Sequence, residues 1–168
     1  MSFKPAPAPQ AQRILDFARS EVFERTFKEG MALVDETAAY LDGPGRAAAK
    51  RLSRLGALAY AGESLRLTTR LMQLASWLLV QRALRDGEMA LGEAAHDKYR
   101  LAARAPAGVD SFAGADEVPE ALQALGARGA ALYERVMRLD AEMYESPIAR
   151  RDDVNDRMAR LAAAFAEA

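Results

Sequence analysis

Apolar residues that recur at spacings of three and four predict that the chain is built from long amphipathic helices. A helix is predicted over residues 21–41, with an apolar stripe made of Phe23, Phe27, Met31, Val34, Ala38 and Leu41. A second is predicted over 119–144, with Leu122, Leu125, Gly129, Leu132, Val136, Leu139 and Met143. Shorter helices are expected at 11–19 and 90–103. Ser20 is suited to cap the first long helix, and Gly43 and Pro44 to end it.

Residues 45–86 predict an unusually long central helix with more than one apolar side. One stripe consists of Leu58, Ala61, Leu65, Thr69, Met72, Ser76, Leu79 and Ala83, and another of Tyr60, Leu67, Leu71, Leu74 and Leu78. Near Trp77 and Leu84 even a third side is apolar, and a helix that is apolar all round is buried all round. We expect a second subunit to bury that third side. The candidate dimer or partner surface is therefore Trp77, Leu84, Arg66 and Arg70.

The chain divides into an arm, a bundle and a tail. Residues 1–10 contain three prolines and are predicted to form a flexible extended arm. Residues 11–147 are predicted to fold as an all-α, three-helix up-down bundle that dimerises. The tail, 148–168, is rich in alanine, and its candidate contact residues are Met158, Leu161 and Phe165. It could be a docked helix, a frayed one, or a segment that is disordered until it binds.

Composition supports the helical interpretation and leaves little catalytic chemistry. The 168 residues include 37 alanines, one histidine and no cysteine, which excludes disulfides, zinc fingers, iron–sulfur clusters and thiol nucleophiles. Glu93 and His96 have the spacing of a metal-binding helix pair, but di-metal bundles need that motif twice. We therefore predict no catalytic residue, no metal and no cofactor. The most apolar run, 71–80, is too short for a membrane span, and no signal peptide is visible, so a cytoplasmic location is expected.

Charge is segregated along the chain although the net charge is only −1. Residues 20–42 carry a balance of −4, residues 43–85 one of +7 and residues 86–120 one of −5. This pattern favours a basic central helix that sits between acidic neighbours. The alternative is a helical regulatory or structural dimer that binds nucleic acid through the central helix, although its basic residues are scattered around the helix.

Three blocks of the sequence resemble a known family, namely Phe23–Arg46 (FERTFKEGMALVDETAAYLDGPGR), Ala57–Gly87 (ALAYAGESLRLTTRLMQLASWLLVQRALRDG) and Lys98–Leu101 (KYRL). These blocks are similar to the regulator of CtrA degradation family of alphaproteobacteria. The resemblance implies a dimeric three-helix bundle with a flexible C-terminal tail. It also implies a non-enzymatic adaptor that binds the ClpXP protease, primed by a response regulator, and delivers cell-cycle regulators for degradation at the cell pole. Such an adaptor works by tethering and needs no catalytic site.

Overall fold

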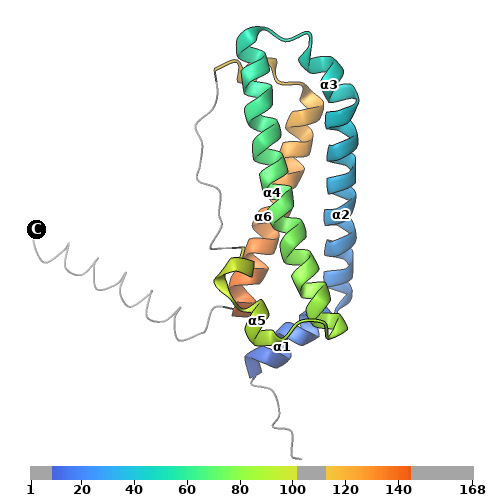
Figure 1. Cartoon of the computed structure of the whole chain (residues 1–168), viewed down its shortest axis with the longest axis vertical. Coiled ribbons are helices and arrows are strands. Elements are labelled where there is room, and N and C mark those ends of the chain that lie inside the picture. Colours follow the sequence, from blue (N-terminus) through green and yellow to red (C-terminus); the bar gives the residue numbers. More distant parts are fainter. Residues whose placement is uncertain (1–8, 102–112, 145–168) are drawn as a thin grey trace, which may run out of the picture.

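Three long helices form the body of the molecule. The computed structural model describes residues 9–101 and 113–144, and within them every regular element is helical, which confirms the all-α class. Helices α2 (Glu21–Asp42), α4 (Arg54–Asp86) and α6 (Glu120–Tyr144) lie side by side, as Figure 1 shows. The short helices α1 (Pro9–Ala18) and α5 (Leu91–Ala94) pack at one end of this bundle.

The order of helix directions differs from the predicted up-down arrangement. Trp77 hydrogen-bonds Asp140, and Gln81, one turn later, hydrogen-bonds Tyr144, so α4 and α6 run parallel. Helix α2 runs opposite to both (Figure 1). The connection 87–119 is long enough to return the chain to the other end of the bundle, since an extended chain spans about 3.3 Å per residue. The alternating order therefore holds for α2 and α4 but not for α6.

The predicted helix 45–86 is divided into two helices. Helix α3 (Pro44–Ala49) is followed by a turn, and α4 begins after Ser53, whose side chain accepts a hydrogen bond from the Gly56 amide. The Ser53 hydroxyl and amide both donate to the Glu117 carboxylate, at 2.5 and 3.0 Å, and these bonds lower the pKa of Glu117. Serine thus starts a new helix where the apolar periodicity alone predicts continuity.

The predicted helix 90–103 is also shorter than expected. Its described part consists of α5 and the single 3₁₀ turn η1 (Asp97–Tyr99). The His96 side chain caps η1, because its Nδ1 accepts a hydrogen bond of 3.3 Å from the Lys98 amide. The one histidine of the chain therefore has a structural role in this turn.

The core lies between the three long helices and extends under α1. Phe23 of α2, Leu74 and Leu78 of α4, and Val136 of α6 are fully buried there. Helices α2 and α4 approach closely at Gly30, where an added Cβ would lie 2.6 Å from the Leu78 side chain. Because glycine has no Cβ, it allows this crossing and fixes how deeply Leu78 enters the core.

A buried ion pair fastens the segment after α4 to the end of α6. Asp140 is 0% exposed, and its carboxylate accepts hydrogen bonds from Trp77 Nε1 at 2.7 Å and from Arg100 Nε at 3.0 Å. The Arg100 guanidinium also lies over the Tyr144 ring, 4.5 Å from its centre. Burial raises the pKa of Tyr144, whose hydroxyl meets Gln81. A buried carboxylate is stable only when it is paired, so Asp140 depends on Arg100.

Replacing Asp140 with alanine should lower the free energy of unfolding by about 3–5 kcal/mol, because the Arg100 guanidinium and the Trp77 indole N–H lose their buried acceptor. Urea denaturation followed by circular dichroism measures the change. Glu36→Ala is the control, since it removes only a solvent-exposed ion pair with Arg128 and should change stability little. Equal effects of the two variants would contradict this account of the buried pair.

Candidate protein-interaction surface

A row of large apolar side chains lies on α4, and no other helix in residues 9–101 and 113–144 covers it. Leu58, Leu65, Met72 and Leu79 are between 53% and 69% exposed, and we call these four residues the apolar face. Their spacing of seven is that of helices that pack against another helix along a narrow seam. Single exposed leucines are common, but a regular row of them marks an interaction surface.

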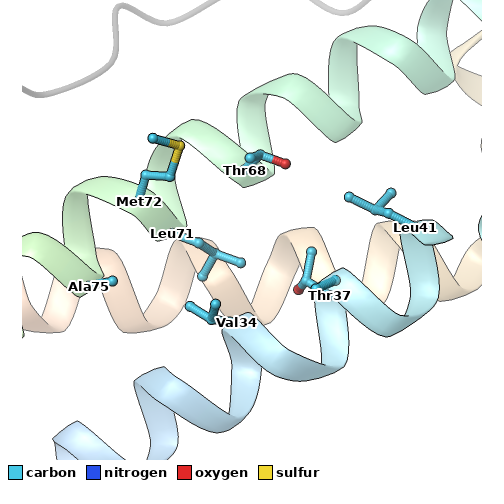
Figure 2. A pocket seen from close by; sticks show the side chains of 8 residues that line it. Val34, Thr37, Leu41, Thr68, Leu71, Met72 and Ala75 are labelled. Carbon is cyan, nitrogen blue, oxygen red and sulfur yellow. The ribbon is translucent and has the colours of Figure 1, made fainter.

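An apolar groove runs beside this face, between α2 and α4. The groove has a volume of about 340 Å³ and is lined by Val34, Thr37, Ala38, Leu41, Thr68, Leu71, Met72 and Ala75. Figure 2 shows Val34 and Thr37 of α2 opposite Leu71 of α4, with Met72 standing away from α2. None of these side chains is ionisable, so the groove can bind an apolar surface but offers no acid–base chemistry.

The sequence predicted the right number of apolar sides on the central helix but assigned the wrong one to the surface. Trp77 is 1% exposed, and its ring packs on Phe17 of α1 with 6.2 Å between ring centres. Leu84 is 3% exposed. The short helix α1 therefore helps to cover the third side within the protomer, which corrects the prediction that Trp77 and Leu84 face a partner. The uncovered side is the first stripe, which contains the apolar face.

Arg66 and Arg70, the other predicted surface residues, lie on a different side of α4. Both line a hollow between α4 and α6. Arg66 pairs with Glu63 at 3.0 Å, and the Arg70 guanidinium lies 5.9 Å from the centre of the Tyr133 ring. The structure therefore does not place them with Trp77 and Leu84, and each pair of residues belongs to a separate part of the molecule.

Ion pairs explain much of the segregated charge. Four basic residues of the 43–85 stretch pair with acids, namely Arg46, Arg66, Arg82 and Arg85. Arg85 joins α4 to Glu24 of α2 at 3.0 Å. The other acids of α2 that pair between helices, Glu29 and Glu36, bind arginines of α6 rather than of α4. This pairing favours charge matching within the bundle over a basic stripe for nucleic acid.

Some predicted features fall outside what the structure describes or find no counterpart in it. Residues 1–8 of the predicted arm 1–10 and the tail contacts Met158, Leu161 and Phe165 lie outside the described residues. Residues 9 and 10 of that arm belong to helix α1 rather than to an extended segment. In residues 9–101 and 113–144 no group of three or more histidine, aspartate or glutamate side chains could hold a metal ion. No helix in these same ranges is long and apolar enough to cross a membrane.

Comparison with known proteins places the chain in a family. The family model described as "Protein of unknown function (DUF1465)" matches residues 14–165. The crystal structure of RcdA from Caulobacter crescentus CB15 is 55% identical, and the match covers 79% of this chain and 98% of that chain with a TM-score of 0.63. The chain belongs to the RcdA family. None of the curated proteins matches it.

Membership of the RcdA family confirms the resemblance to the regulator of CtrA degradation, and the structure gives two of the similar blocks a physical role. The short block Lys98–Leu101 contains Arg100, which binds Asp140, and Leu101, which is 1% exposed. The long block Ala57–Gly87 contains both the buried stripe of α4 and the apolar face. The blocks that resemble the family therefore contain residues of the core and also residues of an exposed surface.

Alanine substitution of two leucines of α4 that lie two positions apart distinguishes this surface from the core. Leu65→Ala should change the free energy of unfolding by less than about 0.5 kcal/mol in dilute solution, because Leu65 is 69% exposed. Leu67→Ala should cost about 2–5 kcal/mol, because Leu67 is 1% exposed and its loss leaves a cavity. Urea titration of both variants checks the assignment. A large loss for Leu65→Ala alone would mean that the apolar face belongs to the core of the protomer.

Proposed function

We propose that the protein is a non-enzymatic adaptor that binds a primed ClpXP-type protease and delivers regulatory proteins to it for degradation. Membership of the RcdA family supports this function, since the regulator of CtrA degradation family is one of protease adaptors. The observation that carries the proposal at the level of the molecule is the apolar face. An adaptor raises the local concentration of substrate at the protease by holding both, so it needs contact surfaces and no reactive groups.

We further propose that the apolar face binds a second copy of the chain. The face is suited to self-association because it is a straight row on one rigid helix, and its chemistry is that of a helix seam. Between its large residues stand small ones, among them Ala61, Thr68 and Ala75, which leave room for the large side chains of a partner helix. A twofold axis makes such a contact self-complementary, because the same patch serves on both subunits.

The spacing specifies an antiparallel register for this dimer. With the axis between Thr68 and Thr69, Leu65 would face Met72 of the partner subunit, and Leu58 would face the partner subunit's Leu79. All four residues of the apolar face would then be paired by one symmetry operation. The groove between α2 and α4 borders this contact through Met72, so dimerisation would cover part of it as well.

The dimer is tested by light scattering on the full chain. The wild type should have twice the chain mass of 18.3 kDa. Leu65→Glu should have the chain mass itself, because a glutamate buried against Met72 of the partner subunit costs more than the contact gains. Val22→Glu is the matched control, since Val22 is also apolar and half exposed but lies on α2, away from the apolar face. If the wild type remains a monomer at micromolar concentration, the proposed dimer is wrong.

The adaptor role is tested by reconstitution. The full chain, a ClpXP-type protease, a priming response regulator and a candidate substrate are combined, and substrate loss is followed with each component omitted in turn. We expect faster degradation only when the chain and the response regulator are both present. Circular dichroism confirms that each preparation is folded. If the chain neither associates with the primed protease nor changes the degradation rate of any regulator tested, the adaptor proposal fails.

A further inference from the structure

A tethering protein must hold two partners at once, so it needs a second surface that stays open when the apolar face is covered. The hollow between α4 and α6 meets this requirement. It has a volume of about 250 Å³ and is lined by Glu63, Arg66, Leu67, Arg70, Leu122, Gln123, Gly126 and Ala127. The groove beside the apolar face is lined from α2, whereas this hollow is lined from α6, so the two lie on opposite flanks of α4.

The described residues that line the hollow carry one positive charge in excess. Arg66 is neutralised by Glu63, with 3.0 Å between the charged atoms. Arg70 forms no ion pair with any described residue, and its guanidinium is instead held on the Tyr133 ring. The Tyr133 hydroxyl is in turn fixed by Gln73 at 3.1 Å. Arg70 is therefore a positioned cation whose hydrogen-bond donors are not used by any acid in residues 9–101 and 113–144.

Apart from Gln123, whose side-chain amide donates to the Val118 carbonyl oxygen, the uncharged part of the lining is apolar. Leu67 and Leu122 are buried and form the floor, and Gly126 faces the space without any side chain of its own. A Cβ added at Gly126 would meet no atom within 4 Å. The hollow thus combines a guanidinium pair with an aliphatic floor in a space that suits one or two amino-acid side chains.

We propose that this hollow binds a carboxylate that stands next to an aliphatic side chain on a protein partner, with Arg70 as the residue that recognises the carboxylate. The inference rests on the proposed adaptor function for its biological meaning. A guanidinium and a carboxylate form paired, charge-assisted hydrogen bonds. A single excess charge matches a carboxylate, whereas a phosphate group carries nearly two negative charges and would meet the Glu63 carboxylate in the same space.

The probe for this site is 4-methylpentanoate, which is an aliphatic chain with one carboxylate. It is titrated into the ¹⁵N-labelled full chain, and the backbone amide of Gly126 is followed by nuclear magnetic resonance. We expect a saturable shift at Gly126. Arg70→Gln should weaken binding roughly tenfold, since one charge-assisted pair is lost. Arg82→Gln, which removes an arginine of α4 that stacks on Phe27 outside the hollow, should leave binding unchanged.

A second variant keeps both arginines and fills the space. Gly126→Leu should abolish the shift of neighbouring amides while raising the midpoint of thermal unfolding, because leucine favours a helix interior more than glycine does. Loss of binding together with a higher unfolding midpoint would show that the variant blocks the site without damaging the fold. Equal affinity in Arg70→Gln and Arg82→Gln, a shift that never saturates, or tighter binding of inorganic phosphate would each overturn the proposal.

The result of the 4-methylpentanoate titration does not depend on the results of the dimer and adaptor tests. Leu65→Glu should bind 4-methylpentanoate as the wild type does, because Leu65 lies on the apolar face and not in the hollow. If substrate delivery fails while the probe still binds at Gly126, the adaptor function is wrong and the carboxylate site stands. If delivery succeeds while the probe does not bind, the site is wrong and the function stands.

Discussion

The structure depends on the fact that α4 has more apolar sides than its long neighbours can cover. Helix α2 covers one flank and α6 another, and the short helix α1 completes the burial of Trp77 through Phe17. The remaining side is covered by no other described helix, and it carries the apolar face. Burial of a leucine side chain contributes about 1.5–3 kcal/mol relative to its exposure to water. The exposed leucines of this 33-residue helix would therefore gain stability if a partner covered them. The arrangement of the described helices therefore leaves an exposed apolar row on α4, which is the basis of the proposed contact between two copies of the chain.

The second constraint is the buried carboxylate of Asp140. It accepts hydrogen bonds from Trp77 of α4 and from Arg100 of the segment that follows α5. One residue of α6 therefore joins three parts of the chain. This network explains why α6 can run parallel to α4. A parallel neighbour requires a long connection, and the Arg100 contact fastens the start of that connection to the bundle. Apolar packing alone accepts several registers, whereas a buried ion pair accepts one, because any slip leaves a charge unpaired.

Much of the fold could be predicted from the sequence, since local rules decide it. The bounds of α2 follow from its apolar spacing, its serine cap and the Gly43–Pro44 stop. Local rules also gave the number of apolar sides on the central helix, but not which of them is free. That depends on where α1 packs, and periodicity carries no information about a distant neighbour. The break at Ser53 and the pairing of Arg100 with a residue 40 positions away were missed for the same reason. Arg66 and Arg70 were predicted to belong to a partner surface, but the hollow that they line was not predicted, because its other wall comes from α6.

The two proposed surfaces differ in a way that matters for tethering. A straight row of leucines is self-complementary under a twofold axis, so it suits an identical partner. A hollow with one excess charge is not self-complementary, because two arginines repel, so it suits a different partner of opposite charge. In the proposed dimer both hollows would remain open, since they lie on the flank of α4 that faces α6. Two equivalent sites on one rigid body raise the effective concentration of a bound protein near a second one, even when each contact alone is weak. A dimeric bundle without a reactive centre could therefore direct another molecule's chemistry through geometry and charge.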